Sequence, residues 1–324
     1  MSIAIMNKRK HIISLVDLSE EETLDIINRG VEYANGTVEL GHQLKGQLIG
    51  IYFTKTSTRT RTAFSTAAIR LGAQVISYGP NDLQINTGEN MDDTMQVLSR
   101  MLDGLVVRTA GCPSVLRTFA DQSRMSVVNA MTEDEHPTQA LADLTTMKHH
   151  FGELSGLDIT YLGEGNNTAV ALALAVAKFS NIRISFFTPS NYHIDPKILQ
   201  YAQKQAAKKN TKIHEFHDIK LLPRTTNVIY TTRWQTTGTT KADVNWREMF
   251  IPFAVTEQLM SKYPNAIFMH DLPAHRGDEV EASVIDGIKS IVFQQAENKG
   301  IALRQFLSGA CDNNSNNFFQ LKIG

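Results

Sequence analysis

Cysteine is scarce in this sequence, which has two, Cys112 and Cys311, among 324 residues. Two thiols cannot build a disulfide framework or a four-ligand zinc site, so we expect neither to hold the fold together. Low cysteine content is typical of proteins that work in a reducing compartment, and we expect a cytoplasmic location. Long hydrophobic runs are lacking as well, because the apolar stretch 169–177 is only about half as long as a membrane-spanning helix. The sequence therefore predicts no membrane partner.

An excess of charge of one sign is also missing, because 32 Lys and Arg residues balance 33 Asp and Glu residues. A formal net charge of −1 gives no bulk field that could hold nucleic acid or an anionic membrane. We expect no nucleic-acid partner, and any anion that the protein binds must be held by a local cluster of donors.

Short apolar runs alternate with helical patterns along most of the chain. A first group of strands is expected over 48–53, 75–78, 104–107 and 127–129, with a helix over 60–71. A second group is expected over 158–162, 183–187, 228–230 and 266–270, with helices over 167–179 and 196–209. This alternation predicts an α/β fold with two doubly wound parallel-sheet domains and an active-site cleft between them.

The length of the chain corresponds to about two domains of roughly 150 residues each. We expect the first domain to cover 1–150, ending with a helix over 136–151, and the second to cover 151–299. A last helix is expected over 288–307. Together with the rest of the chain, about 300–324, it should pack back on the first domain.

The most informative stretch, 53–62, lies between an expected strand and the start of an expected helix. Backbone N–H groups at a helix N-terminus are unpaired, and the helix dipole favours negative charge there. Ser57, Thr58 and Thr60 add hydroxyl donors, and Arg59 adds a planar fork that matches phosphate oxygens. The stretch has too few glycines for a Walker loop. It predicts an anion site, although the same residues could form a hydroxyl-rich helix cap with solvated arginines.

The run Ser57-Thr58-Arg59-Thr60-Arg61 resembles the carbamoyl-phosphate loop of the aspartate/ornithine carbamoyltransferase family. Further motifs follow in that family's order and extend the resemblance over nearly the whole chain: Val107-Arg108, His136-Pro137-Thr138-Gln139, His270-Asp271-Leu272-Pro273 and Ala296-Glu297-Asn298. The resemblance implies a transferase that moves the carbamoyl group of carbamoyl phosphate to the amine of an amino acid. It implies no metal and no organic cofactor, so the expected small-molecule partners are carbamoyl phosphate and an amino-acid acceptor.

The resemblance also assigns roles to individual residues. The expected contacts of carbamoyl phosphate are Ser57, Thr58, Arg59, Thr60, Arg108, His136, Gln139, the backbone carbonyl of Leu272, and Lys299. Among them, Thr60, Arg108 and His136 should donate to the carbonyl oxygen, on which negative charge develops during attack. These three residues and Asp271 are the expected catalytic residues. The family's Leu-Pro bond is cis, which implies a cis bond before Pro273.

Self-association is a further implication of the resemblance. The family forms homotrimers in which a loop of one subunit reaches into the site of its neighbour. In this sequence that loop would lie near 81–89, with Gln84 and Thr87 as the contributing residues.

The acceptor half mixes two branches of the family. The acceptor residues that the resemblance implies are Asn167, Arg233, Gln235, Asp271, Leu272 and Pro273. Asn166-Asn167 and the Leu272-Pro273 segment resemble the ornithine branch. That branch has an Asp where Thr232 stands, a Cys where Asp271 stands and usually an Arg where Lys299 stands. In contrast, Thr232-Arg233-Trp234-Gln235 resembles the T-R-x-Q of the aspartate branch, whose Arg and Gln hold the acceptor's carboxylate.

The matches to the ornithine branch, to which Ala296-Glu297-Asn298 also belongs, favour a divergent ornithine-type enzyme, and the departures predict that it uses ornithine poorly. They suggest as acceptor a shorter diamino acid, such as 2,3-diaminopropionate. Near a dianionic phosphate, the pKa of Asp271 should be raised. Three alternatives stay open: an aspartate-type catalytic chain, a catalytically silent homologue acting as a scaffold or regulatory subunit, and a nicotinamide enzyme built on Gly163-Glu164-Gly165. The last is disfavoured, because a dinucleotide fingerprint needs Gly where Thr168 stands.

Overall fold

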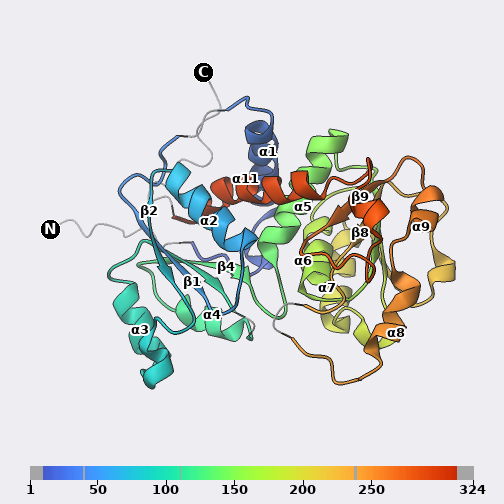
Figure 1. Cartoon of the computed structure of the whole chain (residues 1–324). Coiled ribbons are helices and arrows are strands. Elements are labelled where there is room, and N and C mark those ends of the chain that lie inside the picture. Colours follow the sequence, from blue (N-terminus) through green and yellow to red (C-terminus); the bar gives the residue numbers. More distant parts are fainter. Residues whose placement is uncertain (1–9, 39–40, 110, 237–238, 312–324) are drawn as a thin grey trace.

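Two parallel sheets, one in each half of the chain, organise the protein, whose structure is a computed structural model (Figure 1). It describes residues 10–38, 41–109, 111–236 and 239–311. The first sheet has the strand order β2-β1-β3-β4, with β1 (Leu48–Phe53), β2 (Gln74–Tyr78), β3 (Gly104–Arg108) and β4 (Ser126–Met131). The second has the order β7-β6-β5-β8-β9, with β5 (Asp158–Leu162), β6 (Arg183–Phe187), β7 (Lys212–Phe216), β8 (Val228–Thr231) and β9 (Ile267–His270). The expected fold class is confirmed.

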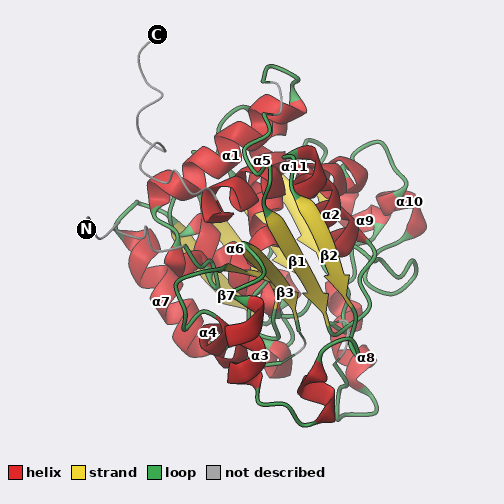
Figure 2. Ribbon diagram, turned by 90° about the vertical axis from the view of Figure 1, so that its left-hand side faces the viewer, coloured by secondary structure: helices red, strands yellow, loops and turns green. Residues whose placement is uncertain are grey.

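Helices flank the sheets on both sides (Figure 2). Those of the first half are α1 (Glu20–Ala34), α2 (Arg59–Arg70), α3 (Met91–Leu98), α4 (Ser114–Phe119) and α5 (Pro137–Phe151). Those of the second half are α6 (Asn167–Val176), α7 (Pro196–Ala207), α8 (Trp246–Phe250), α9 (Glu257–Ser261), α10 (Ala282–Ile285) and α11 (Val292–Cys311). Within the described ranges, no helix combines the length and the apolar character that crossing a membrane requires.

The last helix, α11, lies across the middle of the molecule and packs against α1, α2 and α5 (Figure 1). One hydrophobic cluster runs through both halves at this place, and it includes Phe64, Leu144, Leu172 and Phe306. The expected start of this helix at 288 is wrong, because a turn precedes Val292 and the side chain of Ile288 is exposed. Residues 312–324 lie outside the described part of the chain, so their packing stays a prediction.

Strand positions were easier to predict than helix positions. The strands expected over 48–53, 158–162 and 183–187 occur with those bounds. The edge strand β7 was missed, because only Ile213 of its five residues is buried and its sequence gives no apolar run. Helices α1, α3, α4 and α8 to α10 were not predicted either.

Candidate active site

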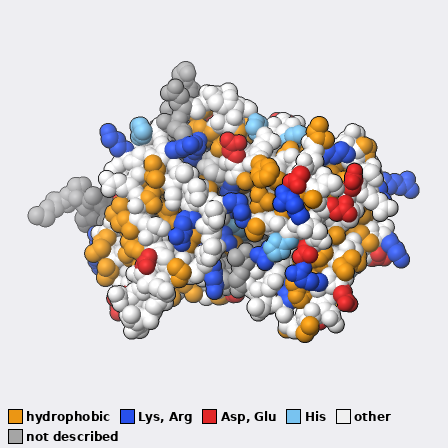
Figure 3. Space-filling view, in the orientation of Figure 1, with side chains coloured by type: hydrophobic (Ala, Val, Ile, Leu, Met, Phe, Trp, Pro, Cys, Tyr) orange, Lys and Arg blue, Asp and Glu red, His pale blue; other side chains and the backbone are white. Residues whose placement is uncertain are grey.

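A cavity of about 290 Å³ lies at the carboxyl ends of strands from both sheets. The strand order reverses between β1 and β3 in one sheet and between β5 and β8 in the other. Such switch points leave a crevice in which α/β proteins bind ligands. On the face shown in Figure 3, Lys and Arg side chains gather over the middle of the molecule. The cavity is lined by Thr56, Ser57, Thr58, Arg59, Thr60, Arg108, Met131, His136, Gln139, Asn166, Asn167, Thr168, Thr232, Arg233, Thr236, Asp271, Leu272, Pro273 and Lys299.

The predicted anion loop leads into a helix without a side-chain cap. α2 begins at Arg59, and the side chain of the preceding Thr58 makes no capping hydrogen bond. The first turn of α2 also carries no acidic residue. Its backbone N–H groups and the positive end of the helix dipole are therefore available to an anion in the cavity. The alternative of a hydroxyl-capped helix is not what the structure forms.

Arg108 ends β3 and points its guanidinium at α2. Its Nη1 donates to Oγ1 of Thr60 at 3.2 Å, while its buried Nε has no hydrogen-bond partner. The register with β4 shifts between Val107 and Arg108, and such an irregularity re-aims a side chain at a strand end. Burial, and then the charge of Arg59, lowers the pKa of Arg108 to about 10. The guanidinium stays charged near neutral pH and keeps a donor for a ligand.

Three side chains, from α5, from the residue that precedes it and from α11, contact one another at the cavity. Nζ of Lys299 donates to Oε1 of Gln139 at 2.8 Å and lies 3.1 Å from Nε2 of His136. Burial, and then the charge of Arg108, lowers the pKa of Lys299 to about 7. Burial and the neighbouring cations also lower the pKa of His136 well below its ordinary value, so its ring is neutral near pH 7. The group therefore offers one titrating cation, one neutral imidazole and one amide.

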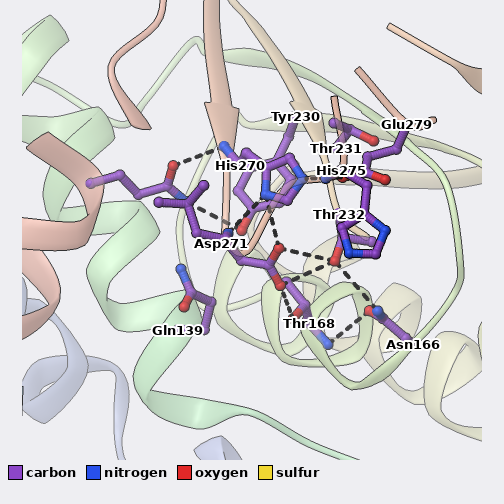
Figure 4. Close-up of polar contacts among 12 residues, drawn as sticks. Gln139, Asn166, Thr168, Tyr230, Thr231, Thr232, His270, Asp271, His275 and Glu279 are labelled. Atoms are coloured by element: carbon purple, nitrogen blue, oxygen red, sulfur yellow. Dashed lines mark hydrogen bonds and ion pairs between the residues drawn. The ribbon is translucent and has the colours of Figure 1, made fainter. Parts of the chain in front are cut away.

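Asp271 follows β9 and accepts hydrogen bonds from two threonines (Figure 4). Oγ1 of Thr168 donates to Oδ2 at 2.9 Å, and Oγ1 of Thr232 lies 3.0 and 3.1 Å from the two carboxylate oxygens. Burial alone would raise the pKa of Asp271, but His270 and the two hydroxyls outweigh it and lower the pKa below its ordinary value. The rise expected beside a dianionic phosphate stays a prediction, because it would have to outweigh these partners, of which the sequence shows only His270. Asp271 is ionised near neutral pH.

The turn after Asp271 is held in an unusual backbone conformation. Leu272 has φ 52°, and the Leu272–Pro273 peptide bond is cis, as the resemblance implies. A positive φ is costly for a bulky side chain, by about 1–3 kcal/mol, and persists only when neighbours enforce it. Here the Leu272 N–H donates to Nδ1 of His270 at 2.8 Å, and Nε2 of His270 lies 3.2 Å from Oε1 of Glu279. The turn places Leu272 and Pro273 in the wall of the cavity.

Arg233 and Gln235, expected as a carboxylate clamp, diverge in the structure. Arg233 lines the cavity, and its buried Nε has no hydrogen-bond partner. Trp234 between them is buried and packs on Phe250, with ring centroids 5.6 Å apart. Gln235 lies outside the cavity wall, and its amide donates to the carbonyl of Thr239 at 2.7 Å. The structure thus brings Arg233, and not Gln235, to the cavity wall.

The loop before α6 is closed by its own side chains. Oδ1 of Asn166 accepts from the N–H groups of Thr168 and Ala169 and caps the helix. Asn167 lines the cavity, and its Nδ2 donates to the carbonyl of Thr132 at 2.7 Å. A Cβ on Gly165 would lie 2.2 Å from the backbone nitrogen of Ile194, so this glycine serves close packing. Because the helix N-terminus is capped, it offers no phosphate site to a dinucleotide, in contrast to α2.

Some lining residues were not assigned to the site from the sequence, namely Thr56, Met131, Asn166, Thr168, Thr232 and Thr236. A signal existed for Thr168, which directly follows two asparagines at the start of an expected helix. Gln84 and Thr87, assigned to a neighbouring subunit's site, lie in an exposed turn where Oγ1 of Thr87 donates to the carbonyl of Gln84 at 2.8 Å. Thr236 lines the cavity, whereas 237–238 lie outside the described residues.

The charge of the cavity suits anions. Among the described lining residues there are four basic side chains, Arg59, Arg108, Arg233 and Lys299, and one carboxylate, Asp271. One carboxylate beside four basic groups does not make a site for a metal ion. Residues of metal-ligand type gather elsewhere, as Cys112, Glu133 and Asp134 and as His275, Asp278 and Glu279, and neither group lines the cavity.

Comparison with known proteins matches the two halves to two domain families. The aspartate/ornithine carbamoyltransferase carbamoyl-P binding domain matches residues 10–149, and the family's Asp/Orn binding domain matches residues 155–305. An ornithine carbamoyltransferase of Nostoc punctiforme is 39% identical over 302 residues, covering 92% of this chain and 96% of the relative. The solved ornithine carbamoyltransferase of Pyrococcus furiosus superposes with a TM-score of 0.87 at 31% identity, covering 96% of this chain and 99% of that one. That of Campylobacter jejuni gives 0.86 at 31% identity, with 95% and 99% covered.

Proposed function

The chain belongs to the aspartate/ornithine carbamoyltransferase family and is a carbamoyltransferase, and on this premise we propose that its acceptor is a short diamino acid. Carbamoyl transfer of the ornithine carbamoyltransferase type is supported by the relatives that it matches. The single observation that carries the acceptor proposal is the ionised carboxylate of Asp271 in the wall of a cavity that also holds Arg233.

Carbamoyl phosphate is proposed to bind at the N-terminus of α2. Ser57, Thr58, Arg59 and the N–H groups of the first turn receive the phosphate, whose charge suits this uncapped helix end. Arg108, Thr60 and His136 face the carbonyl oxygen, and Lys299 adds a further donor beside them. Oε1 of Gln139 and the backbone carbonyl of Leu272 accept from the amide hydrogens. These donors stabilise the negative charge that attack develops on the carbonyl oxygen.

The transfer itself exchanges one bond at the carbamoyl carbon. The lone pair of the acceptor's neutral amine forms the new C–N bond, and the C–O bond to phosphate breaks. Phosphate leaves with the bonding electron pair, and the proton lost by the amine ends on it. The products are a ureido amino acid and inorganic phosphate. Pre-placed donors that need not reorganise are the main contribution of such a site.

The acceptor side suits an α-amino acid head group with a second, reacting amine. Arg233, whose buried Nε has no hydrogen-bond partner, offers its guanidinium to a carboxylate. Asp271, held ionised by His270 and by the hydroxyls of Thr168 and Thr232, is a weak general base and a good partner for an ammonium group. The family resemblance places position 271 beside the attacking amine. An ammonium bound there lies close to the carbamoyl carbon, so fewer methylenes than in ornithine can separate the two amines. 2,3-Diaminopropionate satisfies this requirement.

An acceptor panel tests the proposal. Phosphate release and product mass would be measured with 2,3-diaminopropionate, 2,4-diaminobutyrate, ornithine and aspartate. We expect the highest kcat/KM with 2,3-diaminopropionate and poor use of ornithine. In addition, Arg233→Ala should raise KM for that acceptor and leave KM for carbamoyl phosphate nearly unchanged.

Other outcomes separate the alternatives. Preference for ornithine would overturn the proposal of a short acceptor. Preference for aspartate would favour an aspartate-type chain, an alternative supported by Arg233 in the cavity wall, since the aspartate branch has an Arg at this position. If no amine of the panel supports the release of phosphate, the chain would be a catalytically silent homologue.

We further propose that the chain forms a homotrimer and that the turn with Gln84 and Thr87 completes a neighbour's site. The proposal is supported by the exposure of this turn, whose residues do not line the cavity of their own chain. A cytoplasmic location stays a prediction from the low cysteine content.

A further inference from the structure

A buried carboxylate behind the cavity, Asp143, accepts hydrogen bonds from three elements. It lies on α5, one turn after Gln139, and is 0% exposed. Its Oδ1 accepts from Nε2 of Gln139 at 2.9 Å and from Nε2 of Gln295 at 2.7 Å. Its Oδ2 accepts from the hydroxyl of Tyr230 at 3.0 Å. These partners belong to α5, α11 and β8, so one carboxylate joins the two halves of the molecule.

The ionised form of Asp143 determines which way two amides face. A carboxylate has acceptors only, so a glutamine that contacts it must present its NH₂ group. With Nε2 of Gln139 on Asp143, Oε1 is left to face Lys299, whose Nζ donates to it at 2.8 Å. A reversed amide would place its carbonyl against the carboxylate and, where Lys299 is charged, would also set two donors against each other. Both contacts would be lost in a site with little water to replace them.

The amide of Gln295 is oriented by Asp143 in the same way, on the side of the cavity proposed to bind the acceptor. Oε1 of Gln295 accepts the backbone N–H of His270 at 2.9 Å, and its Nε2 is held by Asp143. His270 directly precedes Asp271 in the sequence. Asp143 is therefore linked by one side chain to each ligand-binding side of the cavity, while itself lying outside the wall.

We propose that Asp143 is a positioning residue that orients the amide of Gln139, so that its oxygen faces the amide hydrogens of carbamoyl phosphate. The proposal rests on the proposed function only for the identity of this ligand. Asp143 touches no reacting atom and acts through Gln139. Its removal should therefore weaken the binding of carbamoyl phosphate through the misdirected amide, beyond any loss of stability.

The test compares variants by calorimetric titration with carbamoyl phosphate near pH 8, where an Asp143 carboxyl of pKa about 7 is mostly ionised. Asp143→Asn keeps the shape but lets the amide at 143 face either way. We expect it to raise the dissociation constant by about tenfold or more. Thr145→Val is the matched control, because Thr145 is buried on the same helix and bonds the carbonyl of Leu141, away from this network. It should leave the dissociation constant within about twofold.

A double-mutant cycle separates positioning from general damage. If Asp143 acts through Gln139, then Gln139→Ala/Asp143→Asn should bind no more weakly than Gln139→Ala alone. The proposal would be overturned if the fold-changes in dissociation constant of the two single variants multiply in the double variant. It would also be overturned if Asp143→Asn binds carbamoyl phosphate as tightly as the parent protein. Asp143→Ser replaces Asp143→Asn, with the same expected outcome, if the latter does not fold. A parent protein that fails to bind carbamoyl phosphate would instead contradict the proposed function.

Discussion

The hydroxyl of Thr232 lies within hydrogen-bond distance of both carboxylate oxygens of Asp271, at 3.0 and 3.1 Å. These residues follow Thr231 and His270, which are register partners on the adjacent parallel strands β8 and β9. The ornithine branch that the sequence resembles has a carboxylate at the first position and a thiol at the second. This chain carries the carboxylate on the neighbouring strand end, and adjacent strands are about 5 Å apart. The cavity therefore has a carboxylate side chain after β9, at Asp271, instead of after β8, at position 232.

Exchanging the two positions should change the acceptor. Thr232→Asp/Asp271→Cys restores the ornithine-branch arrangement, so kcat/KM with ornithine should rise by about tenfold or more. Activity with the shorter acceptor should fall in the same variant. Asp271→Asn is the control, since it removes the charge without restoring it at 232, and it should be poor with both amines. Efficient use of ornithine by the parent protein, with Asp271→Asn fully active, would contradict this account.

The binding of carbamoyl phosphate should depend on Arg59 and not on the nearby Arg61. Arg59 lines the cavity, whereas the guanidinium of Arg61 lies 5.3 Å from the ring centroid of Phe53 and outside the cavity wall. Arg59→Ala should weaken carbamoyl-phosphate binding by about tenfold or more, because charge-assisted phosphate contacts are among the strong ones. Arg61→Ala, which removes the same charge from the same helix turn, should change it little. If both substitutions weaken binding equally, the general positive charge near the cavity, and not a direct contact with Arg59, would account for the binding of carbamoyl phosphate.

The charge of Lys299 should make carbamoyl-phosphate binding depend on pH. Its pKa is lowered to about 7, so the ammonium is charged below that pH and loses its charge as the pH rises through it. Lys299→Arg keeps the charge throughout. The dissociation constant of the parent protein divided by that of Lys299→Arg should therefore increase by about tenfold from pH 6 to pH 8.5. In this ratio, the pH dependence that comes from groups titrating in both proteins cancels. A ratio that does not change with pH would contradict the titration of Lys299.

Glu135 should make the folded protein less stable at alkaline pH. Burial raises the pKa of this carboxyl from 4.5 to about 7, although the Leu15 N–H donates to it at 2.7 Å. Between these values the folded state binds the proton more tightly than the unfolded state, so its stabilising effect is complete at low pH and is lost as the pH rises through 7. The loss amounts to about 3 kcal/mol at most.

Thermal unfolding of Glu135→Gln measures this effect. The amide keeps an acceptor for Leu15 and cannot ionise, so the variant should gain Tm relative to the parent protein at pH 8 and not at pH 5. Glu133→Gln, at an exposed position, is the control and should show no such pH-dependent gain. An unchanged difference between the two pH values would contradict the assignment.

Shared sites should allow two inactive variants to restore each other. Light scattering should give a mass about three times that of the chain if the proposed trimer forms. Gln84→Ala/Thr87→Ala and Arg59→Ala should each be nearly inactive alone. After mixed reassembly, some sites receive an intact phosphate loop from one subunit and an intact turn from another, so activity should return. A monomer that is fully active at low concentration would refute the shared site.

The sequence allowed the architecture to be predicted where its signal was local. Leu48–Phe53 is a continuous apolar run and was placed correctly, whereas Lys212–Phe216 buries one residue and was missed. Most candidate site residues, including Ser57 to Thr60, Arg108, His136 and Gln139, were named before the structure and line one cavity. They could be named because they stand in short linear motifs that resemble those of the carbamoyltransferase family. The roles assigned to them stay predictions.

What the sequence determined by itself is therefore the chemistry of single segments: a parallel α/β fold, an anion loop at a helix start, and the linear motifs of a carbamoyltransferase family. The tertiary structure decided how those segments affect one another. It gave Asp271 hydroxyl partners from 103 and 39 residues away, which together with the neighbouring His270 lower the pKa of this carboxyl. It turned Gln235 away from the cavity and joined Asp143 to Gln295, 152 residues later. The physical reason is that desolvation and hydrogen bonding depend on the whole surroundings of a group, which only packing brings together.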